Sequence, residues 1–160
     1  MPTDDPYELS RFRTAQDAHG TYGEALAELR AGRKTTHWMW FVFPQLAGLG
    51  RSSTAVFFAI TSLDEARAYV ADPVLGPRLV EAALAAAEAP AASATALLGP
   101  VDAVKLRSSM TLFALADPEE PAFTRVLERW FDGVGDTRTV AGLRTRPSPA
   151  GIPSGGAGRP

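Results

Sequence analysis

One segment of this chain concentrates its large aromatic side chains and carries a polar residue near each end. It runs from Thr36 to Gln45, and it holds two of the three tryptophans and one of the two histidines. A surface cannot expose so many rings without aggregating, so we expect the segment in the interior. His37 could then act as a neutral donor or a base, and Gln45, oriented by Pro44, could read a base edge or a sugar hydroxyl. The alternatives are a core histidine bonded to a carbonyl and an amide that caps a turn.

A second group of polar residues follows Pro100, which is a strong helix start. Asp102, Lys105 and Ser109 are spaced at i, i+3 and i+7, so they share one helix face, and Ser108 lies beside them. This density of polar residues predicts a lined pocket, with a surface ion pair between Asp102 and Lys105 as the alternative. No nucleophile elbow surrounds the serines, so we do not predict a serine nucleophile.

Anion binding is predicted for the glycine-rich stretch at residues 48–53. Its backbone N–H groups could form a nest, with Arg51 adding charge and Ser52 a hydroxyl, although an ordinary turn is the alternative. Lys34 and Arg78 are further candidates for anion contacts. For glycosidase-type chemistry the best pair of carboxylates is Asp102 with Glu65, provided that they face one cleft.

Composition excludes several classes of site. The 160 residues carry a net charge of −2 in mixed sequence, which does not favour a nucleic-acid partner. The chain has no cysteine and only two histidines, so we predict no metal and no cofactor. The longest run of large apolar residues is far shorter than the roughly 20 that span a bilayer, and no signal-peptide pattern is present. We therefore expect a cytoplasmic protein with no membrane contact.

Helix signals dominate the elements that must position these residues. The expected helix starts are Asp5-Pro6, two capping boxes at 21–24 and 62–65, Asp72-Pro73, Ser93 and Pro100, and the expected ends are Gly20, Gly32, Gly99 and Gly133. The aromatic segment is expected as a short helix ended by Pro44, with a buried strand as the competitor. For residues 56–60 the sequence predicts either a short strand or a helix start. The sequence predicts an all-α, compact single-domain helix bundle around a buried aromatic segment, with an N-terminal extension at 1–5, the domain at 6–143 and a disordered tail at 144–160.

The aromatic motif also carries a family resemblance. The run from His37 to Gln45, with Gly48-Leu49-Gly50-Arg51-Ser52 and the stretch from Lys105 to Phe113, resembles the uncharacterised bacterial domain-of-unknown-function family number eighteen-ten. Phe58 stands where that family more often has tyrosine. The resemblance covers roughly residues 7–143 and implies an all-helical fold without an established activity. The helical layout is more distantly similar to the NADAR proteins, which act on N-glycosidic ADP-ribose linkages, and no catalytic residue is carried over from them.

Together these residues predict a small-molecule pocket. Its floor would be Trp38, Trp40 and Phe43, and its rim His37, Gln45, Ser52 and Lys105. Such a pocket suits a planar, anionic ligand such as a nucleotide or an ADP-ribose derivative, and hydrolysis of an N-glycosidic bond is the reaction predicted by analogy. The alternatives are a protein-interaction module and a homodimer that uses the apolar stripe of residues 123–131.

Overall fold

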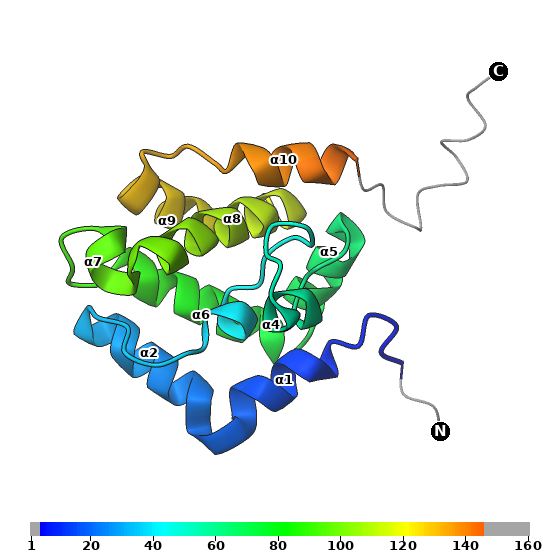
Figure 1. Ribbon diagram of the computed structural model, residues 1–160, viewed down its shortest axis with the longest axis horizontal. Coiled ribbons are helices and arrows are strands. Elements are labelled where there is room, and N and C mark those ends of the chain that lie inside the picture. The colour runs from blue at the N-terminus through cyan, green and yellow to red at the C-terminus, as the bar shows by residue number, and fades with distance from the viewer. Residues whose placement is uncertain (1–3, 146–160) are drawn as a thin grey trace.

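All the regular elements that the structure describes are helices (Figure 1). The computed structural model describes residues 4–145. In chain order the elements are α1 (Ser10–Asp17), the short 3₁₀ turn η1 (Ala18–Gly20), α2 (Thr21–Ala31), α3 (Met39–Val42), α4 (Ser53–Phe57), α5 (Leu63–Ala71), α6 (Leu75–Ala87), α7 (Ala94–Leu98), α8 (Pro100–Ala116), α9 (Pro121–Phe131) and α10 (Thr137–Arg144). Within the described part of the chain the only extended pairing is an isolated parallel bridge between Leu46 and Ile60. The predicted all-α fold is therefore confirmed.

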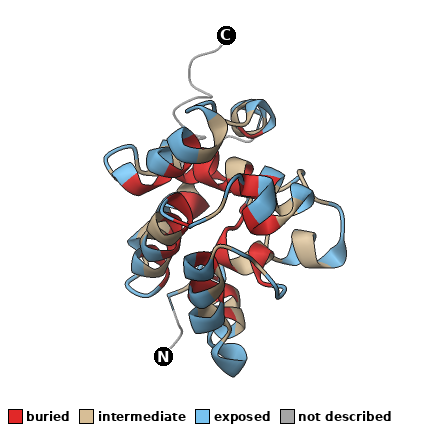
Figure 2. Cartoon of the chain, turned by 90° about the vertical axis from the view of Figure 1, so that its left-hand side faces the viewer, coloured by how far each residue is buried: buried red, intermediate tan, exposed pale blue. Residues whose placement is uncertain are grey.

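The core lies between the longer helices. Helix α6 packs against α2, α5 and α9, and α8 packs against α5, α7, α9 and α10. Buried residues line the inward faces of these helices, while their outward faces are exposed (Figure 2). A chain of ring contacts crosses this core, because Tyr69 touches Phe12 edge-on at 5.1 Å between centroids and Phe113 at 5.3 Å, and Phe113 in turn lies 5.9 Å from Phe123. These contacts tie α1, α5, α8 and α9 into one unit.

Several helix starts form as the sequence predicts, because a short polar side chain accepts an otherwise unpaired N–H of the first turn. Ser62 accepts from the backbone N–H of Glu65, Ser93 from that of Ala96, and Asp72 from that of Leu75. Gly32 ends α2 with φ at 84°, in the left-handed region that glycine tolerates.

One predicted helix start is wrong in position and another in its capping contact. Asp5 was expected to cap a helix beginning at Pro6, but its carboxylate accepts the backbone N–H groups of Leu9 and Ser10, so α1 begins at Ser10. The capping box at 21–24 does not form, since Gly20 takes the cap position and the Thr21 hydroxyl donates to the carbonyl of Ala18 instead. In both places the preceding loop sets the path of the chain and leaves the side chain a different partner.

The aromatic segment contains one helical turn, α3, which ends at Val42 with Phe43 as its C-cap, just before Pro44 as expected. Residues 56–60 form neither the short strand nor the helix start that was expected, because α4 ends at Phe57 and Ile60 makes only an isolated bridge to Leu46. The buried Gln16 on α1 donates to the carbonyl of Phe41 at 2.7 Å, which ties this segment to the first helix.

The last helix ends close to the predicted boundary between the domain and its C-terminal tail. Arg144, the first residue of the predicted tail, is the last residue of α10, and most of that tail lies outside residues 4–145. No helix within the described residues is long and apolar enough to cross a membrane.

Candidate functional site

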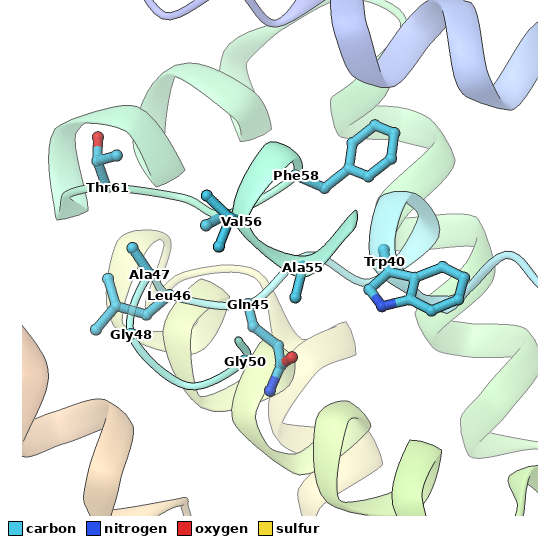
Figure 3. A pocket seen from close by; sticks show the side chains of 11 residues that line it. Trp40, Gln45, Leu46, Ala47, Gly48, Gly50, Ala55, Val56, Phe58 and Thr61 are labelled. Carbon is cyan, nitrogen blue, oxygen red and sulfur yellow. The ribbon is translucent and has the colours of Figure 1, made fainter. Parts of the chain in front are cut away.

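A cavity of about 280 Å³ lies beside the second half of the aromatic segment (Figure 3). The aromatic turn, the glycine-rich turn and α4 with the residues after it supply its wall: Trp40, Gln45, Leu46, Ala47, Gly48, Gly50, Ala55, Val56, Phe58, Ala59 and Thr61. Most of these side chains are apolar and none is charged. Such a lining suits a largely apolar, uncharged group.

The base of this cavity is fixed by the isolated bridge. The N–H of Ala47 donates to the carbonyl of Ile60 at 2.8 Å, and the N–H of Ile60 donates to the carbonyl of Gln45 at 2.9 Å. Leu46 and Ile60 themselves are buried. The bridge therefore anchors both ends of the loop that carries the glycine-rich turn and α4.

Arg11 holds the far wall of the cavity. Its guanidinium donates to the carbonyls of Phe57 and Ala59, at 2.8 and 2.9 Å, and forms an ion pair with Glu65 at 3.0 Å. Only 3% of the Glu65 side chain is exposed, and its other oxygen accepts from the N–H and hydroxyl of Thr61. Glu65 is thus fully engaged in positioning the wall and does not point into the cavity.

Two polar side chains in the wall keep unused hydrogen-bonding capacity. Within residues 4–145, the indole N–H of Trp40 and the side-chain amide of Gln45 have no hydrogen-bond partner. The other two indoles are both paired, Trp38 with Glu28 at 2.9 Å and Trp130 with the carbonyl of Ala86 at 2.9 Å. Figure 3 shows the nitrogen edge of Trp40 turned toward the side of the cavity where the Gln45 amide lies.

Trp38, in contrast to Trp40, belongs to the core and not to the cavity wall. The side chain is fully buried, and its indole N–H donates to the carboxylate of Glu28. The same carboxylate accepts the backbone N–H groups of Thr35 and Thr36, at 2.8 and 3.1 Å, and the Thr36 hydroxyl at 2.5 Å. Partial burial alone would raise the pKa of Glu28, but these hydrogen bonds outweigh it and lower the pKa to about 2. Glu28 therefore fixes the entry to the aromatic segment.

The predicted polar group on α8 forms an ion cluster with Lys34. Asp102 lies 2.8 Å from the ammonium of Lys34 and 3.5 Å from that of Lys105. Each lysine also lies over an indole, Lys34 at 5.1 Å from the centroid of Trp38 and Lys105 at 4.9 Å from that of Trp40. Two cations share one carboxylate here, so the cluster carries an excess positive charge next to a ring of the cavity wall.

The structure does not bring the other predicted site residues into this cavity. His37 is exposed rather than held against the indoles, because the chain turns outward before Trp38. Arg51 is exposed, and the hydroxyl of Ser52 accepts from the N–H of Ala55 as the cap of α4. On α8, Ser108 donates to the carbonyl of Val104, while the buried hydroxyl of Ser109 has no partner within the described residues.

The predicted pocket is therefore only partly assembled. Trp40 and Gln45 line one cavity, but Trp38 and Phe43 are fully buried in the core, and His37, Ser52 and Lys105 are not part of the cavity wall. The proposed carboxylate pair does not form either, since Glu65 is bound to Arg11 and Thr61 whereas Asp102 is bound to the two lysines. Spacing along one helix could not show which neighbour each charge would meet.

Comparison with known proteins places the chain in a family. The model of a family described as proteins of unknown function, DUF1810, matches residues 6–143. The chain belongs to this family. Among solved structures, this DUF1810 protein is similar to the conserved hypothetical protein Rv1873 from Mycobacterium tuberculosis, with 48% sequence identity and a TM-score of 0.84 over 88% of this chain and 99% of that one. A comparison with curated proteins gave no match. The resemblance seen in the aromatic motif is confirmed.

Two contributions to the site of this DUF1810 protein were missed from the sequence. Arg11 was not considered, because nothing in its local sequence shows that its guanidinium reaches the carbonyls of residues 57 and 59. Phe58 was noted only as a departure from the resemblance, yet its ring forms part of the cavity wall. The phenylalanine at this position, where the resembling family more often has tyrosine, was the only sign in the sequence that Phe58 could matter to the site.

Proposed function

We propose that this DUF1810 protein binds a small ligand whose planar ring enters the cavity beside Trp40. The observation that carries the proposal is the pair of unpaired polar groups, the Trp40 indole N–H and the Gln45 amide, in an otherwise apolar wall. Both residues are half-buried, so solvent can reach these two groups, and a ligand in the cavity would take the place of that solvent. Groups left unpaired beside a cavity are suited to a ligand.

Size and charge narrow the kind of ligand. The cavity of about 280 Å³ is slightly smaller than the roughly 300–1,000 Å³ typical of small-molecule sites, so it suits one ring system rather than a whole dinucleotide. A nucleotide or an ADP-ribose derivative would place its ring here and its phosphates outside. The ammonium of Lys105, which lies over the Trp40 ring, is a cation that could support an anionic group on the ligand.

The proposal is for binding. No carboxylate or imidazole lines the cavity, and the three residues considered for catalysis, His37, Asp102 and Glu65, lie outside its wall. Hydrolysis of an N-glycosidic bond, suggested by the distant likeness to the NADAR proteins, therefore stays a prediction from analogy. It would require a group in the cavity that can donate or accept a proton.

A thermal-shift screen of the full chain with nucleosides, nucleotides and ADP-ribose tests the proposal. A ligand at 100 times its Kd stabilises a protein by about 2.7 kcal/mol, which corresponds to a rise in Tm of roughly 5 °C or more for a domain of this size. The blocking variant Ala55→Phe fills the cavity from α4, a helix without a buried residue, and should abolish the shift. The exposed His37→Ala variant is the control and should keep it. A shift that survives Ala55→Phe would show that the ligand binds elsewhere.

A protein-interaction role is the second candidate, and one observation favours it. Val56 and Phe57 on α4 are 63% and 58% exposed, which is unusual for adjacent large apolar side chains. The dimer predicted through residues 123–131 has less support, because Phe123, Val126 and Leu127 are buried against this chain's own helices. Light scattering on the wild type and a Phe57→Ser variant tests self-association through α4. A monomer in both would remove the dimer alternative.

A further inference from the structure

Several backbone and side-chain groups around the cavity are used within the fold. The carbonyl of Gln45 and the N–H of Ala47 are bonded to Ile60. The carbonyl of Ala59 accepts from Arg11, and the hydroxyl of Thr61 donates to Glu65. The side chains that keep a free donor in the wall are therefore Trp40 and Gln45, and Gln45 also keeps a free acceptor.

These two side chains are held on well-defined backbone. Trp40 lies within α3, and Gln45 follows Pro44 and enters the bridge to Ile60 through its own carbonyl. Figure 3 shows the amide of Gln45 beside Gly50 and below Ala55, with the indole nitrogen of Trp40 on the edge of the ring nearest to it. The main chain thus fixes the position from which each side chain starts, and both side chains line the same cavity.

We infer that the cavity selects a neutral ring with an amide-type edge, in which an N–H lies next to an acceptor, together with one further acceptor. A glutamine amide offers one acceptor and a donor in the same plane, so it matches an edge that carries one donor and one acceptor side by side. The indole N–H can only donate, so it matches the additional acceptor. This inference rests on the proposed function and names its ligand class: lactam rings such as oxopurines and pyrimidinones, or rings that bear a carboxamide.

The same argument predicts what the cavity rejects. A ring that lacks the N–H leaves the amide oxygen of Gln45 without a partner once water is displaced, and an unpaired polar group in such a place is costly. Because no carboxylate lines the wall, a cationic ring would lose its hydration without gaining a counter-ion. Selection therefore depends on hydrogen bonding at one edge of the ring.

Matched pairs of probes test this inference by titration calorimetry on the full chain. The pairs are uracil with 1,3-dimethyluracil and nicotinamide with N,N-dimethylnicotinamide, in which methylation removes the donor and keeps the ring. We expect at least one unmethylated probe to bind about 10-fold or more tightly than its methylated partner, the equivalent of one lost hydrogen bond. Gln45→Met, which keeps the length of the side chain without its amide, should reduce that ratio to about 1, whereas His37→Ala should leave it unchanged.

Each other outcome has a separate meaning. Equal binding of both members of each pair, or a preference that persists in Gln45→Met, overturns the selection by Gln45 while the proposed binding of a planar ring still stands. Failure of all four probes to bind overturns the inference, and the wider nucleotide screen then decides the proposed function by itself. Because the probe pairs give a ratio on the wild type, the test does not depend on the variants folding normally.

Discussion

Replacing Glu28 by glutamine should weaken the fold by removing a charge from the entry to the aromatic segment. The carboxylate accepts four hydrogen bonds, from the backbone of Thr35 and Thr36, from the Thr36 hydroxyl and from the indole of Trp38. Glutamine retains one oxygen that can accept bonds, but it loses the charge that strengthens them. The fully buried Trp38 then depends on a weaker anchor.

The expected size follows from the lowered pKa. A fall from the ordinary 4.5 to about 2 corresponds at most to about 3.4 kcal/mol at neutral pH, and solvent screening of this partly exposed group reduces it to about 1–2 kcal/mol. Because the pKa is depressed in the folded state, this stability is present above pH 4.5 and is lost as the pH falls toward 2. At about pH 3, less than half of this contribution to the free energy of unfolding should remain.

Urea unfolding of the wild type, Glu28→Gln and Glu24→Gln at several pH values between 3 and 7 measures this effect. Glu24 lies one turn earlier on α2 and is exposed, so it is the matched control. We expect Glu28→Gln to lose about 1–2 kcal/mol at pH 7 and the loss to shrink as the pH falls. A loss equal to that of Glu24→Gln, or one that does not change with pH, would refute the role of the charge.

Two further predictions concern the frame around the site. Gly32→Ala should lower the free energy of unfolding by about 2 kcal/mol or more, because φ is 84° and the added Cβ would lie 2.4 Å from the carbonyl oxygen of Pro90. Gly23→Ala, whose added Cβ would meet no atom within 4 Å, should instead stabilise α2 by about 0.5–1 kcal/mol. Thermal unfolding compares the two variants, and equal effects would contradict the reasoning. Arg11→Leu should cost about 3 kcal/mol because it leaves the buried carboxylate of Glu65 without its cation, and the double variant Arg11→Leu/Glu65→Gln should recover about 1 kcal/mol or more in urea unfolding. A double variant no more stable than the single one would argue against an uncompensated charge.

Local signals predicted the elements well where a residue interacts with its near neighbours. Ser62, Asp72 and Ser93 cap helices as expected, because a cap needs only an N–H two or three residues further on. The same signals failed at Thr21 and Asp5, where the turns before the helices gave the side chains other partners. Such failures are expected because a loop conformation depends on contacts that are distant in sequence.

The aromatic segment shows the same division at the site. From its composition, the sequence by itself determined that the segment would lie in the interior and identified the family, since both depend on residue types and their order. Only the tertiary structure decided which ring is core and which is cavity wall. Trp38 and Trp40 are equally apolar in sequence, but Glu28 from α2 takes the N–H of Trp38, and no described residue takes that of Trp40. Whether each polar group is paired depends on residues that are distant in sequence, and the spacing of residues along the chain does not show which of them come close in the fold.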